Sequence, residues 1–181
     1  MHTYISLLRG INVNGQKLIK MDALRALYEN LGFQNVKSYL QSGNVIFNTD
    51  QVSSEELTAA IKSAILATFG FEVPVLILTP VQLQKAIDSN PFADTTAFET
   101  ASIYFTFLFS AASLDDFAIV EAKKSDTERL LLTDQLVYLY CPNGYGKTKL
   151  SNNFIESKLK LLATTRNWKT VNELHALATK N

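Results

Sequence analysis

The sequence contains very little cysteine, histidine or tryptophan, and its positive and negative charges balance. Its 181 residues include one cysteine, two histidines and one tryptophan, with 17 basic and 17 acidic side chains. A single cysteine excludes an intrachain disulfide framework. A hydrophobic share of 47% excludes intrinsic disorder, which requires low hydrophobicity together with high net charge. The longest stretch without charge, 100–114, is shorter than the roughly 20 residues that cross a bilayer, so no membrane partner is expected.

Signals for export, metal binding and catalysis are also missing. The first positive charge follows the apolar residues of the N-terminus, the reverse of a secretion signal, and we expect a cytoplasmic protein. His2, Cys141 and His175 lack the spacing of metal ligands, so the sequence predicts no metal and no cofactor. No catalytic motif is found, and catalytic residues cannot be named.

The balanced charge hides an uneven distribution. Residues 1–49 hold five basic and two acidic groups, residues 50–140 hold five and thirteen, and residues 141–181 hold seven and two. Two cationic ends therefore flank an anionic middle. If the ends meet in space, they form a positive face that favours anionic ligands; the alternative is that these charges only solvate the surface.

Hydrophobic periodicity predicts two halves with a similar order of elements. In the first half, strands are indicated at 3–8, on both sides of the turn at 42–44, and at 73–79, with amphipathic helices at 21–31, 53–69 and after Thr79. The second half gives strands at 102–110, 129–133 and 136–140, and helices beginning at Ser113, near Ile155 and at Thr170.

This order favours an α+β fold of two related ferredoxin-like halves, βαββα(β), each an antiparallel sheet with helices packed on one face. The predicted domains are 1–90, a βαββαβ half plus a helix at 80–90, and 102–181, a βαββα half with a C-terminal helix. Residues 91–101 are the predicted connector, because Pro, Asp and Thr suit a surface linker.

Four segments resemble one family of bacterial proteins. They are RGINVNG after the first strand, KMDALRALYENLGF in the first helix, VKSYLQSGNVIF in the first hairpin and TTRNWKTVNEL before the last helix. The chain resembles the family of unknown function designated DUF1697, whose members usually have Gly-Gly where this chain has Asn14-Gly15. The resemblance implies a compact α+β protein with two related halves, and it implies no activity.

Two loops partly match a phosphate-binding P-loop. GINVNGQK (10–17) has its lysine one position late and lacks the hydroxyl that binds Mg²⁺, so a structural turn competes with a weak anion site formed by Arg9, Asn12 and Lys17. CPNGYGKTKLS (141–151) has Cys141 in place of the first glycine, and no strand ending in an aspartate follows it. We therefore expect no P-loop ATPase. Lys147 and Lys149 could still hold a phosphate at a helix start, with a plain hairpin exit as the alternative.

A third segment, TTRNWKT (164–170), also precedes a predicted helix. Arg166 offers a forked donor, Asn167 offers an amide, and Trp168 could stack on a ring. In the alternative interpretation, Arg166 pairs with the acidic middle, Asn167 bonds the loop backbone and Trp168 belongs to the core.

These segments lead to one hypothesis and two alternatives. The hypothesis is a non-catalytic module that binds a phosphorylated small molecule or a nucleic acid through basic loops. Its candidate ligand-binding residues are Arg9, Asn12, Lys17, Lys147, Lys149, Arg166 and Asn167. The alternatives are an enzyme acting on a phosphorylated small molecule, and a protein-interaction or homodimerisation module.

Overall fold

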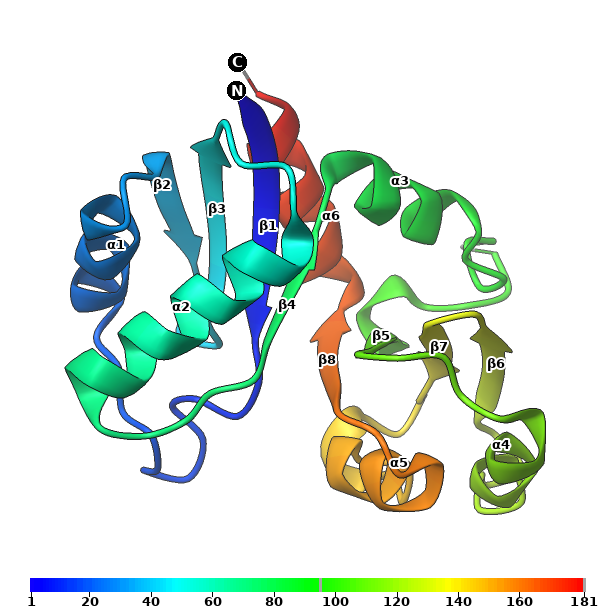
Figure 1. Cartoon of the computed structure of the whole chain (residues 1–181). Helices are drawn as coiled ribbons and strands as arrows, with labels where there is room; N and C mark the ends of the chain where they lie inside the picture. The colour runs from blue at the N-terminus through cyan, green and yellow to red at the C-terminus, as the bar shows by residue number, and fades with distance from the viewer. Residues whose placement is uncertain (95, 181) are drawn as a thin grey trace. The chain divides into compact units, whose positions relative to one another are not determined.

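The computed structural model describes residues 1–94 and 96–180, which form two compact units (Figure 1). One unit contains residues 1–84 together with the segment from Glu173 onward, and the other contains Lys85–Asn172. The terminal helix therefore contributes residues to both units. The domain boundaries expected from the sequence, 1–90 and 102–181, stay a prediction.

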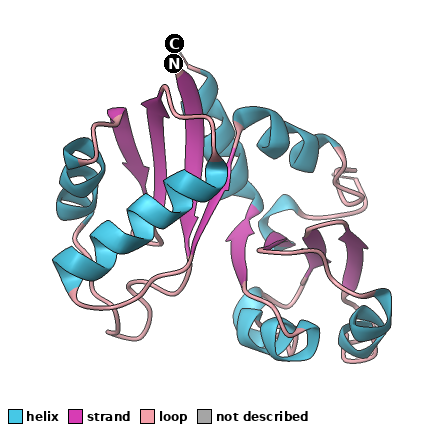
Figure 2. Ribbon diagram, viewed as in Figure 1, coloured by secondary structure: helices cyan, strands magenta, loops and turns pink. Residues whose placement is uncertain are grey.

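The first half is a four-stranded antiparallel sheet in the order β2-β3-β1-β4. The chain follows the predicted βαββαβ order and adds one further helix (Figure 2). The elements are β1 (His2–Leu8), α1 (Met21–Asn30), β2 (Gln34–Tyr39), β3 (Asn44–Thr49), α2 (Ser54–Phe69), β4 (Val75–Leu78) and α3 (Pro80–Asp88).

The core of this half lies between the sheet and the apolar faces of α1 and α2. Leu24 and Tyr28 of α1 join Leu57 and Ile61 of α2 and Phe47 of β3, all fully buried. The stripe at helical spacing in the sequence therefore marks the buried face of each helix. A capping box at the start of α3 is formed in both directions between Thr79 and Gln82, with N···O distances of 2.8 and 3.2 Å.

The second half repeats the same topology. Its antiparallel sheet has the order β6-β7-β5-β8. In both halves the strands therefore lie across the sheet in the order second, third, first, fourth. α4 and α5 pack on one face, around Val120, Leu139 and Ile155. The elements are β5 (Ile103–Leu108), α4 (Leu114–Glu121), β6 (Arg129–Thr133), β7 (Leu136–Tyr140), α5 (Asn152–Leu159), β8 (Ala163–Asn167) and α6 (Trp168–Thr179), with short 3₁₀ turns at Thr100–Ser102 and Tyr145–Lys147.

The strand β8 corrects the sequence prediction, which ended the second half at βαββα and placed a loop at 164–170. β8 pairs only with β5, so it is an edge strand. β8 has the two threonines that strands favour, but it has neither the apolar run nor the alternation of apolar and polar residues that indicated the other strands.

One predicted helix start is confirmed, and the ends of two other helices differ. α4 begins at Leu114 with Ser113 as its N-cap, although the side chain of Ser113 makes no capping hydrogen bond. The spacing of Ile155, Leu159 and Leu162 predicts a helix through Leu162, but α5 ends at Leu159 with Lys160 in the left-handed conformation. α6 begins at Trp168, not at Thr170, and the side chain of Asn167 caps it.

Aromatic residues cover the other face of the second sheet. Phe92 and Phe98 pack on Tyr140 with ring centroids 6.1 and 4.9 Å away, and Trp168 lies 5.9 Å from Phe105. Phe92 is buried, so the segment expected to be a surface linker contributes to this core.

Candidate functional site

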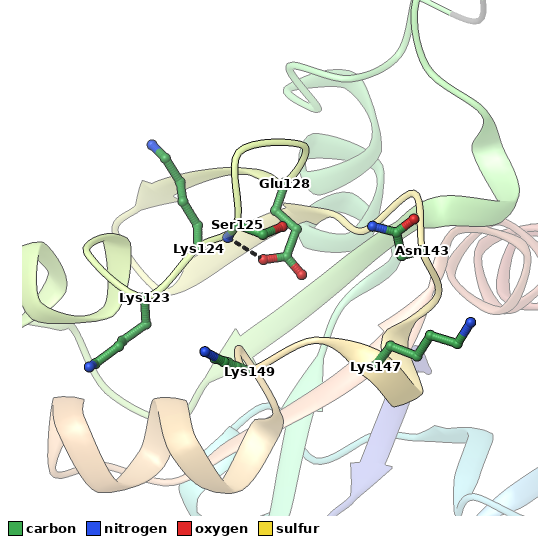
Figure 3. Close-up of a pocket in the computed structure, with 7 residues that line it drawn as sticks. All are labelled: Lys123, Lys124, Ser125, Glu128, Asn143, Lys147 and Lys149. Carbon is green, nitrogen blue, oxygen red and sulfur yellow. Dashed lines mark hydrogen bonds between the residues drawn. The ribbon is translucent and has the colours of Figure 1, made fainter.

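Four lysines line a hollow of about 380 Å³ in the second unit, here called the lysine pocket (Figure 3). One wall comes from the loop between α4 and β6, the other from the loop between β7 and α5. The lining residues are Lys123, Lys124, Ser125, Glu128, Asn143, Lys147 and Lys149.

The strand register brings these two loops together. Arg129, the first residue of β6, pairs with Tyr140, the last residue of β7. Because the two strands are antiparallel, the loop that enters β6 and the loop that leaves β7 lie at the same edge of the sheet. A hydrogen bond of 3.3 Å from Nδ2 of Asn143 to Oγ1 of Thr127 joins them.

Most of the positive charge in the pocket is not neutralised locally. Lys124 forms an ion pair with Glu121 at 3.0 Å. Lys123, Lys147 and Lys149 are exposed and make no side-chain hydrogen bond or ion pair with any residue that the structure describes. Three of the four lysines that line the pocket thus have no partner for their ammonium groups among the described residues.

The loop that carries Lys147 and Lys149 is anchored on both sides of these residues. The ring of Tyr145 lies 4.9 Å from that of Tyr104, and its hydroxyl donates to Oγ1 of Thr165 at 3.1 Å. Leu150 is fully buried, and its backbone nitrogen donates to Oγ1 of Thr148 at 3.0 Å. The two lysines therefore project from an anchored backbone.

The helix start that follows this loop is already capped. Oγ of Ser151 accepts a hydrogen bond of 3.3 Å from the backbone nitrogen of Phe154. One of the free N–H groups at the start of α5 is therefore satisfied by the protein's own side chain.

The predicted residues of the first unit make hydrogen bonds to the backbone of their own and neighbouring loops. Asn12, with φ at 55°, donates from Nδ2 to the carbonyls of Ile19 and Gln41 at 3.0 and 2.8 Å and accepts from the nitrogen of Ile19 at 2.8 Å. Nζ of Lys17 donates to the carbonyl of Glu72 at 2.7 Å. Arg9 is half-buried, and its backbone nitrogen bonds the carbonyl of Pro74.

Arg166 and Asn167 lie outside the lysine pocket. Arg166 is 8% exposed, its Nη1 donates to Oγ1 of Thr164 and to the carbonyl of Thr165, and burial lowers its pKa to about 10. Asn167 caps α6 and lines a second hollow of about 280 Å³ with Thr100, Ala101, Trp168 and Lys169. The structure therefore brings together only Lys147 and Lys149 of the predicted set in the lysine pocket.

The structure adds residues to the site that the sequence prediction missed. Lys123 and Lys124 come from the segment 50–140, whose net charge is negative, so the charge distribution concealed them. The adjacent pair Lys123-Lys124 at the end of a helix was the available signal. No sequence pattern indicated Glu128 or Asn143, because only the pairing of β6 with β7 places them in the same pocket.

Other kinds of site find no support in the described part of the chain. Within residues 1–94 and 96–180, no group of three or more His, Cys, Asp or Glu could hold a metal ion. Cys141 is buried, and burial, with a contribution from the charge of Glu128, raises its pKa to about 11. None of the helices described has the length and apolar character to cross a membrane.

The family is settled by a match over more than half of the sequence. Residues 1–138 match the model of the family described as protein of unknown function, DUF1697. The chain belongs to this family. The family expected from the sequence segments is thus confirmed, with the first three of the four segments inside the matched residues. The matched residues end before the loop that carries Lys147 and Lys149.

Among solved structures, the DUF1697 protein is similar to the conserved bacterial protein SP0830 from Streptococcus pneumoniae. The two share 23% sequence identity and a TM-score of 0.77, over 98% of this chain and 99% of the other. At this identity the likeness concerns the fold alone, and it fits two similar α+β halves. No curated protein matches the chain.

Proposed function

We propose that the second half of this protein binds a small phosphorylated molecule in the lysine pocket, without catalysing a reaction on it. The observation that carries the proposal is that four lysines line one hollow, three of them without a carboxylate partner among the described residues. Ammonium groups bind phosphate as point charges, and several around one hollow raise the local concentration of anions.

The internal repeat supports a specific role for these lysines. In the first half, the equivalent loops are residues 31–33, before β2, and residues 50–53, after β3. These loops contain no lysine and include Asp50. The shared topology therefore does not require the lysines, and their presence in only one half favours a ligand at that site.

The shape of the site favours a small molecule over a nucleic acid. A volume of about 380 Å³ lies at the lower end of the roughly 300–1,000 Å³ of ligand pockets. Nucleic-acid binding uses a basic stripe that follows a backbone, whereas these lysines surround a single hollow. We expect the protein to meet this ligand in the cytoplasm.

Calorimetric titration with inorganic phosphate and pyrophosphate tests the proposal. The double variant Lys147→Ala/Lys149→Ala should bind at least about tenfold more weakly, because it loses two charge-assisted contacts. The matched control is Lys62→Ala/Lys85→Ala, which removes the same charge from exposed positions outside the pocket. The control should keep wild-type affinity within a factor of about two, since distant exposed charges are screened.

Two results contradict this function. Unchanged affinity in the pocket variant places the anion elsewhere on the protein. An equal loss in both double variants means that total charge, and not the pocket, determines binding.

A further inference from the structure

Glu128 is a buried carboxylate in the wall of a pocket otherwise dominated by lysines. It is 6% exposed and lies at the end of the turn that leads into β6. The backbone nitrogen of Ser125 donates to its Oε2 at 2.8 Å, and the nitrogen of Glu128 itself donates to the carbonyl of Ser125 at 3.1 Å. This turn fixes the orientation of the side chain.

The turn uses only one of the two carboxylate oxygens. Figure 3 shows the other oxygen directed into the hollow, on the side of Asn143 and Lys149. Within the described part of the chain, no group donates a hydrogen bond to this Oε1. The pocket therefore presents one preoriented acceptor among its ammonium groups.

A carboxylate in this position is unfavourable for a bare phosphate. It repels the anion, and it accepts hydrogen bonds without being able to donate any while it is ionised. An acceptor that a bound ligand covers and leaves unpaired costs binding free energy. The complementary ligand therefore carries a hydrogen-bond donor beside its phosphate.

We propose that the ligand of the lysine pocket is a small phosphomonoester with a hydroxyl or ammonium group a few atoms from the phosphate. The lysines hold the phosphate, and Oε1 of Glu128 accepts from the hydroxyl or ammonium. This inference rests on the proposed function, since it assigns the ligand class of the same pocket. A site that must satisfy a buried polar group discriminates strongly against ligands that lack the matching donor.

Four probes test this preference in the wild-type protein. Glycerol 1-phosphate supplies hydroxyls, O-phosphoethanolamine supplies an ammonium, n-propyl phosphate has a similar size without a donor on its alkyl group, and inorganic phosphate is the anion without any organic group. By calorimetry, at least one of the two donor-bearing probes should bind roughly tenfold more tightly than n-propyl phosphate, the range of a hydrogen bond to a charged group. Whichever donor-bearing probe binds more tightly identifies the donor as hydroxyl or ammonium.

Glu128→Gln is the matched variant. Its amide oxygen can still accept from the nitrogen of Ser125, which leaves the amide NH₂ group facing the hollow. The preference for the donor-bearing probes should disappear, and n-propyl phosphate should bind at least as well as it does to the wild type, because a negative charge is gone. Urea unfolding of both proteins checks that the variant is folded.

The outcomes separate this inference from the proposed function. Equal binding of all four probes by the wild type, dependent on Lys147 and Lys149, overturns the role of Glu128 and leaves the phosphate site in place. A preference that survives in folded Glu128→Gln also overturns it. If none of the probes binds, the proposed function fails and the ligand class fails with it.

Discussion

The side-chain oxygen of Asn167 accepts a hydrogen bond from the backbone nitrogen of Thr170 at 2.8 Å. Asn167 is the last residue of β8 and stands directly before α6. It therefore satisfies one of the free N–H groups at the start of that helix. A residue that the sequence suggested as a ligand contact thus has a defined structural role.

Replacing this cap should destabilise the protein without affecting the lysine pocket. Asn167→Ala is expected to lower the free energy of unfolding by about 1 kcal/mol. Asn167→Asp keeps a capping oxygen and should stay close to wild type. Urea unfolding measures both, and phosphate affinity at the lysine pocket should be unchanged. A loss of phosphate binding in folded Asn167→Ala would return this residue to the ligand site.

Gly43 occupies a position where a side chain meets both steric and backbone strain. Its φ is 75°, and a Cβ there would lie 2.7 Å from Cβ of Leu8 and 2.8 Å from Cδ1 of Ile11. Gly43→Ala should therefore destabilise the protein by about 3 kcal/mol. The control Gly70→Ala has φ at 79° but open space around it, and should cost only about 1 kcal/mol. Equal losses in urea unfolding would show that the contacts with Leu8 and Ile11 relax freely.

Cys141 should be unreactive while the protein is folded. The thiol is 1% exposed, and its pKa is raised to about 11 by burial, with the charge of Glu128 adding to the effect. At pH 8 its thiolate fraction is about 200-fold below that of an ordinary cysteine. Reaction with a disulfide reagent should be slow in native buffer and become complete in denaturing urea. Immediate stoichiometric reaction in native buffer would mean that the loop after β7 opens readily.

Stability should fall at alkaline pH because buried tyrosines resist ionisation. Burial raises the pKa of Tyr138 to about 12, and its hydroxyl donates to the carbonyl of Ala86 at 2.8 Å. The folded state therefore holds this proton more tightly than the unfolded state, whose tyrosines titrate near pH 10. The contribution, about 2–3 kcal/mol, is complete below pH 10 and is lost as the pH rises towards 12.

The variant Tyr138→Phe isolates this contribution. It should be less stable than wild type at pH 8, because the carbonyl of Ala86 loses its donor, and its stability should decline less steeply above pH 10. Urea unfolding at pH values from 8 to 11 measures how the free energy of unfolding of each protein changes with pH. Identical slopes in the two proteins would contradict the assignment to Tyr138.

The elements that the sequence predicted are those with a strong hydrophobic period. The stripes of α1 and α2 and the hairpin β2–β3 follow from spacing and turn chemistry alone. β8 was not predicted, because two threonines and an arginine on an edge strand give no alternation of apolar and polar residues. Asn12 adopts the left-handed conformation of a turn residue, but its three hydrogen bonds depend on Ile19 and Gln41, which only the folded loop brings near.

The site was predictable only in part for a related reason. Lys147 and Lys149 stand in a glycine-containing basic loop that can be recognised in the sequence. Lys123 and Glu128 join them because Arg129 pairs with Tyr140, a register that no local pattern specifies. Sequence patterns thus identified one wall of the pocket, and tertiary pairing supplied the other.

The central claim is that phosphate binds in the lysine pocket, and a titration of the ¹⁵N-labelled full chain with inorganic phosphate, followed by amide NMR, tests it most directly. The account predicts saturable shifts at residues 123–128 and 143–149, abolished in Lys147→Ala/Lys149→Ala. Shifts confined to residues 9–20, or to residues 100, 101 and 167–169 around the second hollow, would contradict it.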